Sequence, residues 1–211
     1  MPACVVGLME EPLNGRGRSS RVLLLCGAYL CGLALVFGAV VFITGRSPLG
    51  PAVAAVGGPF HLEDQNGKPV SDADMNGRPF LVFFGFTRCP EVCPTTLFYI
   101  SEMLRRLGKD ADRTAALFIT VDPERDTPAV LKDYMSSFDP HMRALTGDPA
   151  AVNAVLKAYR VYAKKVPLEG GDYTMDHTAV VYLMDKDGHF VAPFDLKRTP
   201  EAAAAELRQY L

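Results

Sequence analysis

Cys89 and Cys93 stand four positions apart in the segment FTRCPEVCPTTL, and each is followed by a proline. The segment comes directly after an apolar run at residues 80–85. Two thiols at this spacing are compatible with a structural disulfide, a thiol–disulfide exchange couple or a soft-metal site. A disulfide that closes so short a loop removes little conformational entropy from the unfolded chain, so a reactive pair is the better interpretation.

The prolines indicate how the chain holds the two cysteines. A residue before a proline is biased towards extended geometry, whereas a proline suits the first position of a helix because it has no N–H to satisfy. We therefore expect a helix to begin at Pro94, with Cys93 at its N-terminus and Cys89 in the preceding loop. The helix dipole would then lower the pKa of Cys93.

The possible roles of a reactive cysteine pair differ in the spacing and the neighbouring residues that they require. Thiol–disulfide catalysts usually have the spacing C-x-x-C, so C-x-x-x-C weakens that interpretation without excluding it. A peroxidase of the peroxiredoxin type would have a threonine three residues before its cysteine, where this sequence has Phe86 and Pro90. Two soft thiolates suit Cu(I), and a third ligand is then expected.

His177 is the candidate for the third ligand. It follows a glycine-containing loop at residues 168–176 and immediately precedes an apolar strand at residues 178–184, so a strand would fix its backbone and a loop would gate it. A thioredoxin-type oxidoreductase would have a proline just before such a strand, and its absence here favours a metal site. The remaining histidines are interpreted as surface residues: His61, His141 and His189.

Asp126 lies in the segment DPERDTP, which follows the apolar run at residues 116–121 and should face the same edge of the sheet as the cysteines. Two roles are open for this carboxylate. It could cap the following helix or hold Arg125, which would be structural. It could instead support the metal site from outside the ligand set, by fixing its charge and hydrogen bonds.

Hydrophobic periodicity predicts the elements that position these side chains. Strands and helices alternate, and the chain ends in a hairpin and a helix, which predicts a three-layer α/β domain with a mixed central sheet and a thioredoxin-like architecture. The predicted strands lie around an Asn66–Gly67 turn at residues 60–70 and at 81–84, 116–121, 143–146, 178–184 and 189–192. The predicted helices lie after the cysteines to Leu107 and at 127–138, 148–159 and 199–211.

The N-terminal region predicts one transmembrane helix. Residues 22–43 carry no charge, and 22 helical residues are long enough to cross a hydrocarbon core of roughly 30 Å. Arginines precede this run, so the N-terminus should stay in the cytoplasm. A cleaved signal peptide is the alternative, although its apolar region would be only about 7–15 residues long. The expected organisation is a cytoplasmic tail at 1–21, an anchor at 22–43, a flexible tether at 44–58 and an exported domain at 59–211.

The cysteine distribution and the net charge limit what the exported domain can bind. Three of the five cysteines, Cys4, Cys26 and Cys31, fall in the predicted tail and anchor, so Cys89 and Cys93 form a self-contained pair. The chain has a formal net charge of −2 and no basic patch, which argues against a nucleic-acid partner.

Together these residues resemble the Sco (SenC) proteins, a family of membrane-anchored copper proteins of cytochrome c oxidase assembly. The resemblance covers about residues 60–211. The motifs that carry it are F-x-L-x-x-x-x-G from Phe60, FFGFT from Phe83, CPxxCPTT from Cys89, VDPxxDTP from Val121, and DHT from Asp176.

The resemblance implies a thioredoxin-like domain that binds one copper ion per chain through Cys89, Cys93 and His177. It also implies that the protein helps to deliver copper to the CuA site of cytochrome c oxidase subunit II, after receiving it from an upstream donor. The aspartate that matches Asp126 would support the site or its partner. The N-terminal tail contains Glu10 and Glu11, unlike an acid-poor mitochondrial presequence, so we expect a bacterial inner membrane protein with its domain in the periplasm.

The same residues fit two other roles. A thiol–disulfide reductase would use the redox-active pair Cys89 and Cys93 to reduce the CuA-site cysteines of subunit II. A redox or copper sensor would dock on a signalling partner. The sequence predicts a metallochaperone and leaves a reductase activity open.

Overall fold

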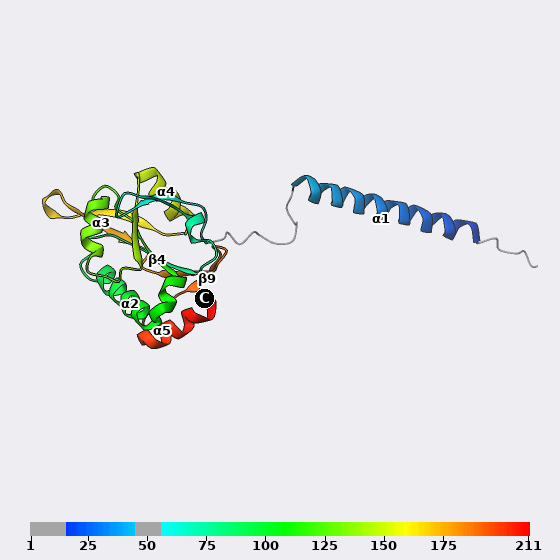
Figure 1. Cartoon of the computed structure of the whole chain (residues 1–211). Coiled ribbons are helices and arrows are strands. Elements are labelled where there is room, and N and C mark those ends of the chain that lie inside the picture. The colour runs from blue at the N-terminus through cyan, green and yellow to red at the C-terminus, as the bar shows by residue number, and fades with distance from the viewer. Residues whose placement is uncertain (1–15, 45–55) are drawn as a thin grey trace, which may run out of the picture. The chain divides into compact units, whose positions relative to one another are not determined.

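The computed structural model describes residues 16–44 and 56–211, which belong to two separate units (Figure 1). Cys4, most of the predicted tail and most of the predicted tether lie outside the described residues. Residues 16–21 of the predicted tail are helical and form the N-terminal end of the first helix.

Helix α1 (Arg16–Thr44) carries Arg16, Arg18 and Arg21 near its N-terminal end and is uncharged from Val22 onwards. Its central 19 residues, Leu24–Phe42, have a mean hydropathy of 2.3, and none of them is buried. A helix of this length and composition can cross a membrane, although a signal sequence near the N-terminus meets the same criteria. The structure thus agrees with the predicted apolar span and extends the helix by about two turns at its N-terminal end.

Seven strands of the second unit form one mixed sheet, as predicted. The strand order is β2-β1-β5-β4-β3-β8-β9. The three central strands β3, β4 and β5 are parallel, and the outer strands pair antiparallel to their neighbours. The bounds are β1 (His61–Asp64), β2 (Pro69–Ser71), β3 (Phe80–Gly85), β4 (Ala115–Thr120), β5 (Met142–Thr146), β8 (Val181–Met184) and β9 (Phe190–Pro193).

Four helices of this unit begin close to where the sequence predicted them: α2 (Val92–Leu107), α3 (Pro128–Met135), α4 (Pro149–Ala158) and α5 (Pro200–Leu207). The side chains of Thr127, Asp148 and Thr199 accept a backbone N–H of the first turn of α3, α4 and α5, and a proline follows each cap. The cap-before-proline prediction is therefore confirmed. Short 3₁₀ helices are η1 (Asp72–Met75), η2 (Gly108–Arg113), η3 (Glu169–Gly171) and η4 (Arg208–Tyr210).

The helices cover both faces of the sheet. Helices α2 and α3 connect β3 to β4 and β4 to β5 in the same direction, so right-handed crossovers place both on one face. Helix α5 packs beside α2, and α4 lies at the opposite side in Figure 1. Phe83 stacks on Phe118 with ring centroids 6.1 Å apart, while its neighbour Phe84 points the other way and contacts Tyr159 after α4 at 5.3 Å. This arrangement is the predicted three-layer α/β domain.

One element differs from the prediction. The segment before His177 is not a loop but an antiparallel hairpin of its own, β6 (Ala163–Pro167) and β7 (Tyr173–His177). Its turn contains Gly170 and Gly171, which adopt φ values of 83° and 86° that favour glycine. Figure 1 shows this gold hairpin projecting from the domain at the left of the view. His177 therefore ends a strand, and the buried strand β8 begins only at Val181.

Candidate metal centre

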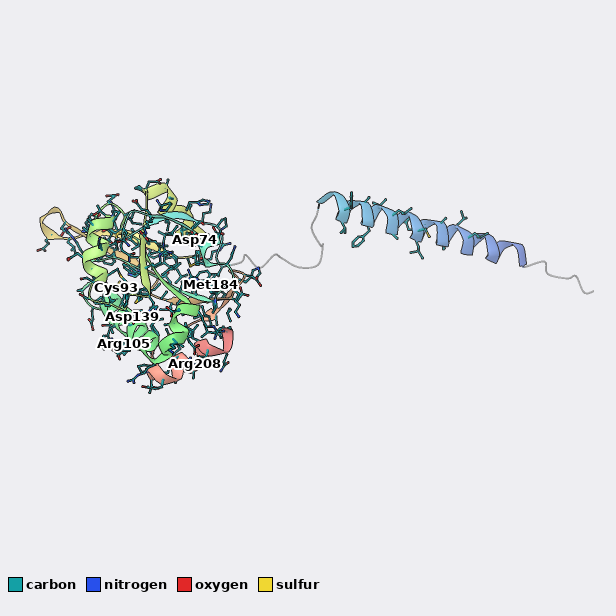
Figure 2. The ribbon with its side chains drawn as sticks, in the orientation of Figure 1. Asp74, Cys93, Arg105, Asp139, Met184 and Arg208 are labelled. Carbon is teal, nitrogen blue, oxygen red and sulfur yellow. The ribbon has the colours of Figure 1, made fainter. Side chains whose placement is uncertain are left out.

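The cysteines lie at the carboxyl ends of the central parallel strands, where α/β sheets commonly bind ligands. Strand β3 ends at Gly85, and a Cβ atom on this residue would lie 2.8 Å from the Cys93 sulfur and 2.7 Å from the Phe118 ring. No side chain fits in that space. Cys93, which is labelled in Figure 2, can pack against β3 only because the strand ends in a glycine.

Cys93 is fully buried, and burial raises the pKa of its thiol far above the ordinary value. The predicted lowering of this pKa is therefore wrong. The reason is that α2 begins at Val92, two residues before Pro94, so Cys93 is helical and faces the sheet. The backbone N–H of Cys93 donates to the Cys89 sulfur at 3.4 Å, so the start of α2 gives this hydrogen bond to Cys89 and not to Cys93.

Cys89 is only half-buried, and it belongs to the loop between β3 and α2. Its backbone N–H donates to the carbonyl of Phe86 at 3.2 Å, which closes a tight turn. Both cysteines are free thiols. The pair therefore consists of one sulfur that is accessible from solvent and one that is enclosed by the core.

His177 reaches the cysteines from the end of β7. Its Nε2 atom lies 3.8 Å from the Cys93 sulfur, and its Nδ1 atom lies 3.1 Å from the carbonyl oxygen of Thr178. A carbonyl only accepts, so Nδ1 carries the proton and Nε2 presents its lone pair towards the sulfur. Phe86 packs edge-on against the imidazole at a centroid distance of 5.7 Å. The ring is thus oriented for metal ligation.

The structure brings the three predicted ligands together. The two sulfurs and a ring nitrogen of His177 all lie within 4.8 Å of one another. Two thiolates and one imidazole form a soft donor set that suits copper, whereas a structural zinc site would require a fourth ligand that this group does not include. The residues present therefore fit a copper ion. Because the ligands must be deprotonated, binding at Cys93 would displace a firmly held proton.

Asp126 is fully buried next to this group but is not one of its ligand atoms. Its carboxylate accepts hydrogen bonds from the N–H and hydroxyl of Thr87, at 3.1 and 2.6 Å, and from the hydroxyl of Thr120, at 2.6 Å. Burial raises the pKa of Asp126, although these hydrogen bonds favour the charged form. Asp126 ties the end of β4 to the segment that leads into Cys89.

The structural role that the sequence suggested for Asp126 is wrong. Thr127 caps α3, and Arg125 pairs with Asp122, whose Oδ2 atom accepts from the Arg125 Nε at 2.5 Å. Asp126 faces inward instead because the two hydroxyls and one N–H around it satisfy a buried carboxylate. Its support of the metal site through Thr87 stays a prediction.

The other histidines lie outside this site. His61 and His189 are exposed, and His141 pairs through its two ring nitrogens with Asp139 at 2.7 Å and Asp112 at 3.3 Å. His189 also lies near Asp185 and Asp187 in the exposed turn before β9. The Asp185 side chain accepts the N–H groups of residues 187 and 189, so it shapes the predicted turn.

Sequence reasoning gave no role to Asp122 and Tyr173, and it named Arg125 only as a possible partner of Asp126. These residues connect the hairpin of His177 to the segment after β4: Tyr173 donates its hydroxyl to Asp122 at 2.8 Å, and the Arg125 guanidinium stacks on the Tyr173 ring at 3.6 Å. The Gly170–Gly171 pair between β-forming residues was a local signal for the hairpin. No local signal pointed to its partners.

Known proteins resemble this chain in sequence and in structure. The SCO1/SenC family matches residues 50–211. The copper-bound structure of ScoI from Bradyrhizobium japonicum is 66% identical, covers 74% of this chain and all of its own, and superposes with a TM-score of 0.73. The copper-bound structure of yeast Sco1 is 37% identical over 74% of this chain and 88% of its own, with a TM-score of 0.67.

An Arabidopsis thaliana protein, the mitochondrial SCO1 homolog 1, is 36% identical over 162 residues. That alignment includes 74% of this chain and 48% of the Arabidopsis protein, so the chain spans about half the length of this relative. The likeness to the two copper-bound structures confirms the predicted thioredoxin-like architecture of the domain.

Proposed function

The chain belongs to the SCO1/SenC family, and on that premise we propose that it is a membrane-anchored copper chaperone. It carries one copper ion per chain between Cys89, Cys93 and His177. The observation that carries this proposal is the convergence of two sulfurs and one imidazole nitrogen within 4.8 Å. The copper in the structures of the Bradyrhizobium and yeast relatives supports the choice of metal.

Different exposure of the two cysteines suggests how the ion is handed over. Cys89 meets solvent, so incoming thiolates of an acceptor reach the ion from its side, while the buried Cys93 holds the ion until the last exchange. His177 lies on a projecting hairpin and can withdraw without unfolding the sheet. The proposed acceptor is the CuA site of cytochrome c oxidase subunit II, and an upstream protein supplies the copper.

The proposed location is a bacterial inner membrane, with α1 as a single-pass anchor and the domain in the periplasm. The length and apolar composition of α1 support an anchor, and the arginines at its N-terminal end support this orientation. The proposed domain boundaries are 1–21, 22–43, 44–58 and 59–211, and the helix that contains the anchor begins at Arg16, inside the proposed tail.

Copper binding to the reduced full-length chain in detergent tests the proposal. We expect one copper per chain, lost in the double variant Cys89→Ala/Cys93→Ala. The matched control is Cys26→Ala/Cys31→Ala, which removes two thiols from α1 and should bind copper normally. His177→Ala should weaken copper retention by about 10–100-fold. Equal copper content in all four proteins would contradict the proposed site.

A reductase role is the second candidate, and the contact between the two cysteines favours it. The Cys89 thiolate would attack a disulfide of subunit II and release one thiolate, and Cys93 would then attack the Cys89 sulfur and release the second. Two electrons pass to the acceptor, and a Cys89–Cys93 disulfide remains. Rapid exchange with an oxidised subunit II peptide, without tight copper binding, would favour this role. A sensor would show copper binding without transfer or exchange.

A further inference from the structure

His177 is carried by an element that has little stability of its own. Strands β6 and β7 form a separate two-stranded sheet, and most residues of the hairpin are exposed or only half-buried. An isolated two-stranded hairpin is at best marginally stable in water. Something outside the hairpin must therefore hold His177 3.8 Å from the Cys93 sulfur.

Arg125, in the segment between β4 and α3, provides that hold. Its Nη1 atom donates to the Asp172 carboxylate at 3.0 Å and to the carbonyl of Tyr173 at 2.9 Å, at the start of β7. Its guanidinium carbon lies 3.6 Å from the centroid of the Tyr173 ring. One side chain thus makes three contacts with the hairpin, from a position 47 residues away in the sequence.

Asp122 fixes Arg125 in this position. The Asp122 carboxylate is 1% exposed and accepts from the Arg125 Nε with one oxygen and from the Tyr173 hydroxyl with the other, at 2.5 and 2.8 Å. The Arg125 side chain is only 14% exposed, so solvent and salt screen this pair much less than an exposed one. We call Asp122, Arg125, Asp172 and Tyr173 the Arg125 clasp.

Two exposed ion pairs extend the clasp to its surroundings. Lys165 of β6 bonds to Glu124 at 2.5 Å and lies 4.6 Å from the centroid of the Tyr173 ring. Arg88, the residue before Cys89, lies 3.5 Å from the second oxygen of Asp172. The hairpin is therefore connected to the cysteine loop as well as to the loop after β4. Exposed pairs contribute little, so the part-buried contacts that Arg125 and Asp122 make with Tyr173 dominate.

We propose that Arg125 is a positioning residue for copper retention, which acts through His177 by clasping the β6–β7 hairpin against the loop that follows β4. This inference rests on the proposed copper site and adds the residue that controls its third ligand. When the clasp is closed, the imidazole faces the sulfurs. When it opens, the hairpin moves away and the ion is held by the two cysteines alone.

The geometry explains why the residue is arginine. A guanidinium offers donors in a rigid planar fork and stacks on an aromatic ring, so it reaches Asp122, Asp172 and the Tyr173 ring at once. Lysine keeps the charge beside Asp122 but presents a single ammonium group. Arg125→Lys is therefore the substitution that opens the clasp without leaving the buried Asp122 carboxylate uncompensated.

The first measurement is the rate at which excess Cu(I) chelator removes copper from the reduced full-length chain in detergent. We expect Arg125→Lys to accelerate removal by about 10–100-fold, and Tyr173→Phe, which lacks only the hydroxyl, to act in the same direction. The matched control is Arg143→Lys, which alters a part-buried pair with Asp64 at 3.1 Å. This control should leave the rate unchanged.

A double-mutant cycle identifies the route of the effect. If Arg125 acts through His177, Arg125→Lys should have no further effect on copper removal in a His177→Ala background. An equal acceleration in both backgrounds would overturn the proposal, because Arg125 would then act on the cysteines or on the whole fold.

Hydrogen exchange of the copper-free protein tests the clasp without the metal. The backbone amides of β6 and β7 should lose protection in Arg125→Lys and keep it in Arg143→Lys. Unchanged protection of the hairpin would overturn the clasp. If wild type and His177→Ala lose copper at the same rate, the proposed ligand set fails, and hydrogen exchange alone still decides whether Arg125 holds the hairpin.

Discussion

The two sulfurs of the site differ in exposure, and this difference divides their roles. Cys93 is enclosed by Gly85 and the core, and burial raises its pKa, so the thiol is protonated in the metal-free protein. Cys89 accepts a backbone N–H at the start of α2 and remains accessible. A ligand exchange that begins at Cys89 and ends at Cys93 follows from this asymmetry.

Asp126 is the residue whose loss should disturb the cysteine loop most directly. Asp126→Ala leaves the Thr87 and Thr120 groups without their buried acceptor, which should lower the free energy of unfolding by about 1–3 kcal/mol. Urea denaturation of the copper-free protein measures this change. Thr127→Ala, which removes the cap of α3 instead, is the control for a general loss of stability in this segment. We expect copper retention to fall in Asp126→Ala but not in the control, and equal retention in both would contradict a link to the site.

His141 should make stability depend on pH. Its hydrogen bond to Asp139, with a further contribution from Asp112, raises the pKa of this imidazole in the folded protein. A raised folded-state pKa stabilises the fold below the unfolded value of about 6.5, and the contribution is lost as pH rises through the folded-state pKa. We expect the urea midpoint to fall less steeply with pH in His141→Gln than in the wild type. The range to measure is about pH 5.5 to 8.5, in which histidine side chains titrate. Parallel curves for the two proteins would contradict this assignment.

At the scale of elements, the end of β3 and the start of α2 are packed as one unit. Gly85→Ala introduces a methyl group into a space already filled by the Phe118 ring and the Cys93 sulfur. Overpacking of this kind should lower the free energy of unfolding by about 1–3 kcal/mol and displace Cys93, which should weaken copper retention. Denaturation and copper titration measure the two effects. Gly58→Ala is the control, because its new methyl group would meet only Ala158, at an ordinary contact distance of 3.4 Å.

In the proposed copper site, the hairpin of β6 and β7 is the part that we expect to move. The sheet holds the cysteines through β3 and the buried start of α2, whereas His177 depends on a small sheet that is connected by polar contacts. Polar contacts of this kind have a marginal net stability, so one ligand can be released while two are kept. Copper transfer requires such a combination of ligands that keep the ion and a ligand that can dissociate from it.

At the scale of the whole molecule, the domain should fold without its anchor. The chain divides into units at residues 1–52 and 53–211, and the copper-bound relative from Bradyrhizobium covers 74% of this chain with all of its own length. A chain that consists of residues 53–211 should be soluble, unfold at the same temperature as the full-length protein and bind one copper. Calorimetry and copper analysis test this expectation. A large loss of thermal stability would show that the N-terminal unit stabilises the domain.

Much of this protein was determined by local features of its sequence. An uncharged apolar run predicts α1, caps before prolines predict the starts of α3, α4 and α5, and periodicity predicts the mixed sheet. The ligand types were also readable, because two thiols at a fixed spacing and one well-placed histidine have few chemical uses. These signals are local, since they reflect the backbone preferences and side-chain chemistry of neighbouring residues.

Only the tertiary structure decided how these residues behave. The pKa of Cys93 depends on how completely the core encloses its sulfur, and the helix start alone predicted the wrong direction. Asp126 bonds to Thr87, 39 residues away, and Arg125 to Asp172, 47 residues away. Desolvation and long-range contacts arise from packing, which leaves no pattern among sequence neighbours. The sequence thus determined which residues could bind a metal, and the fold decided which of them is buried, which is half-buried and which lies on a separate hairpin.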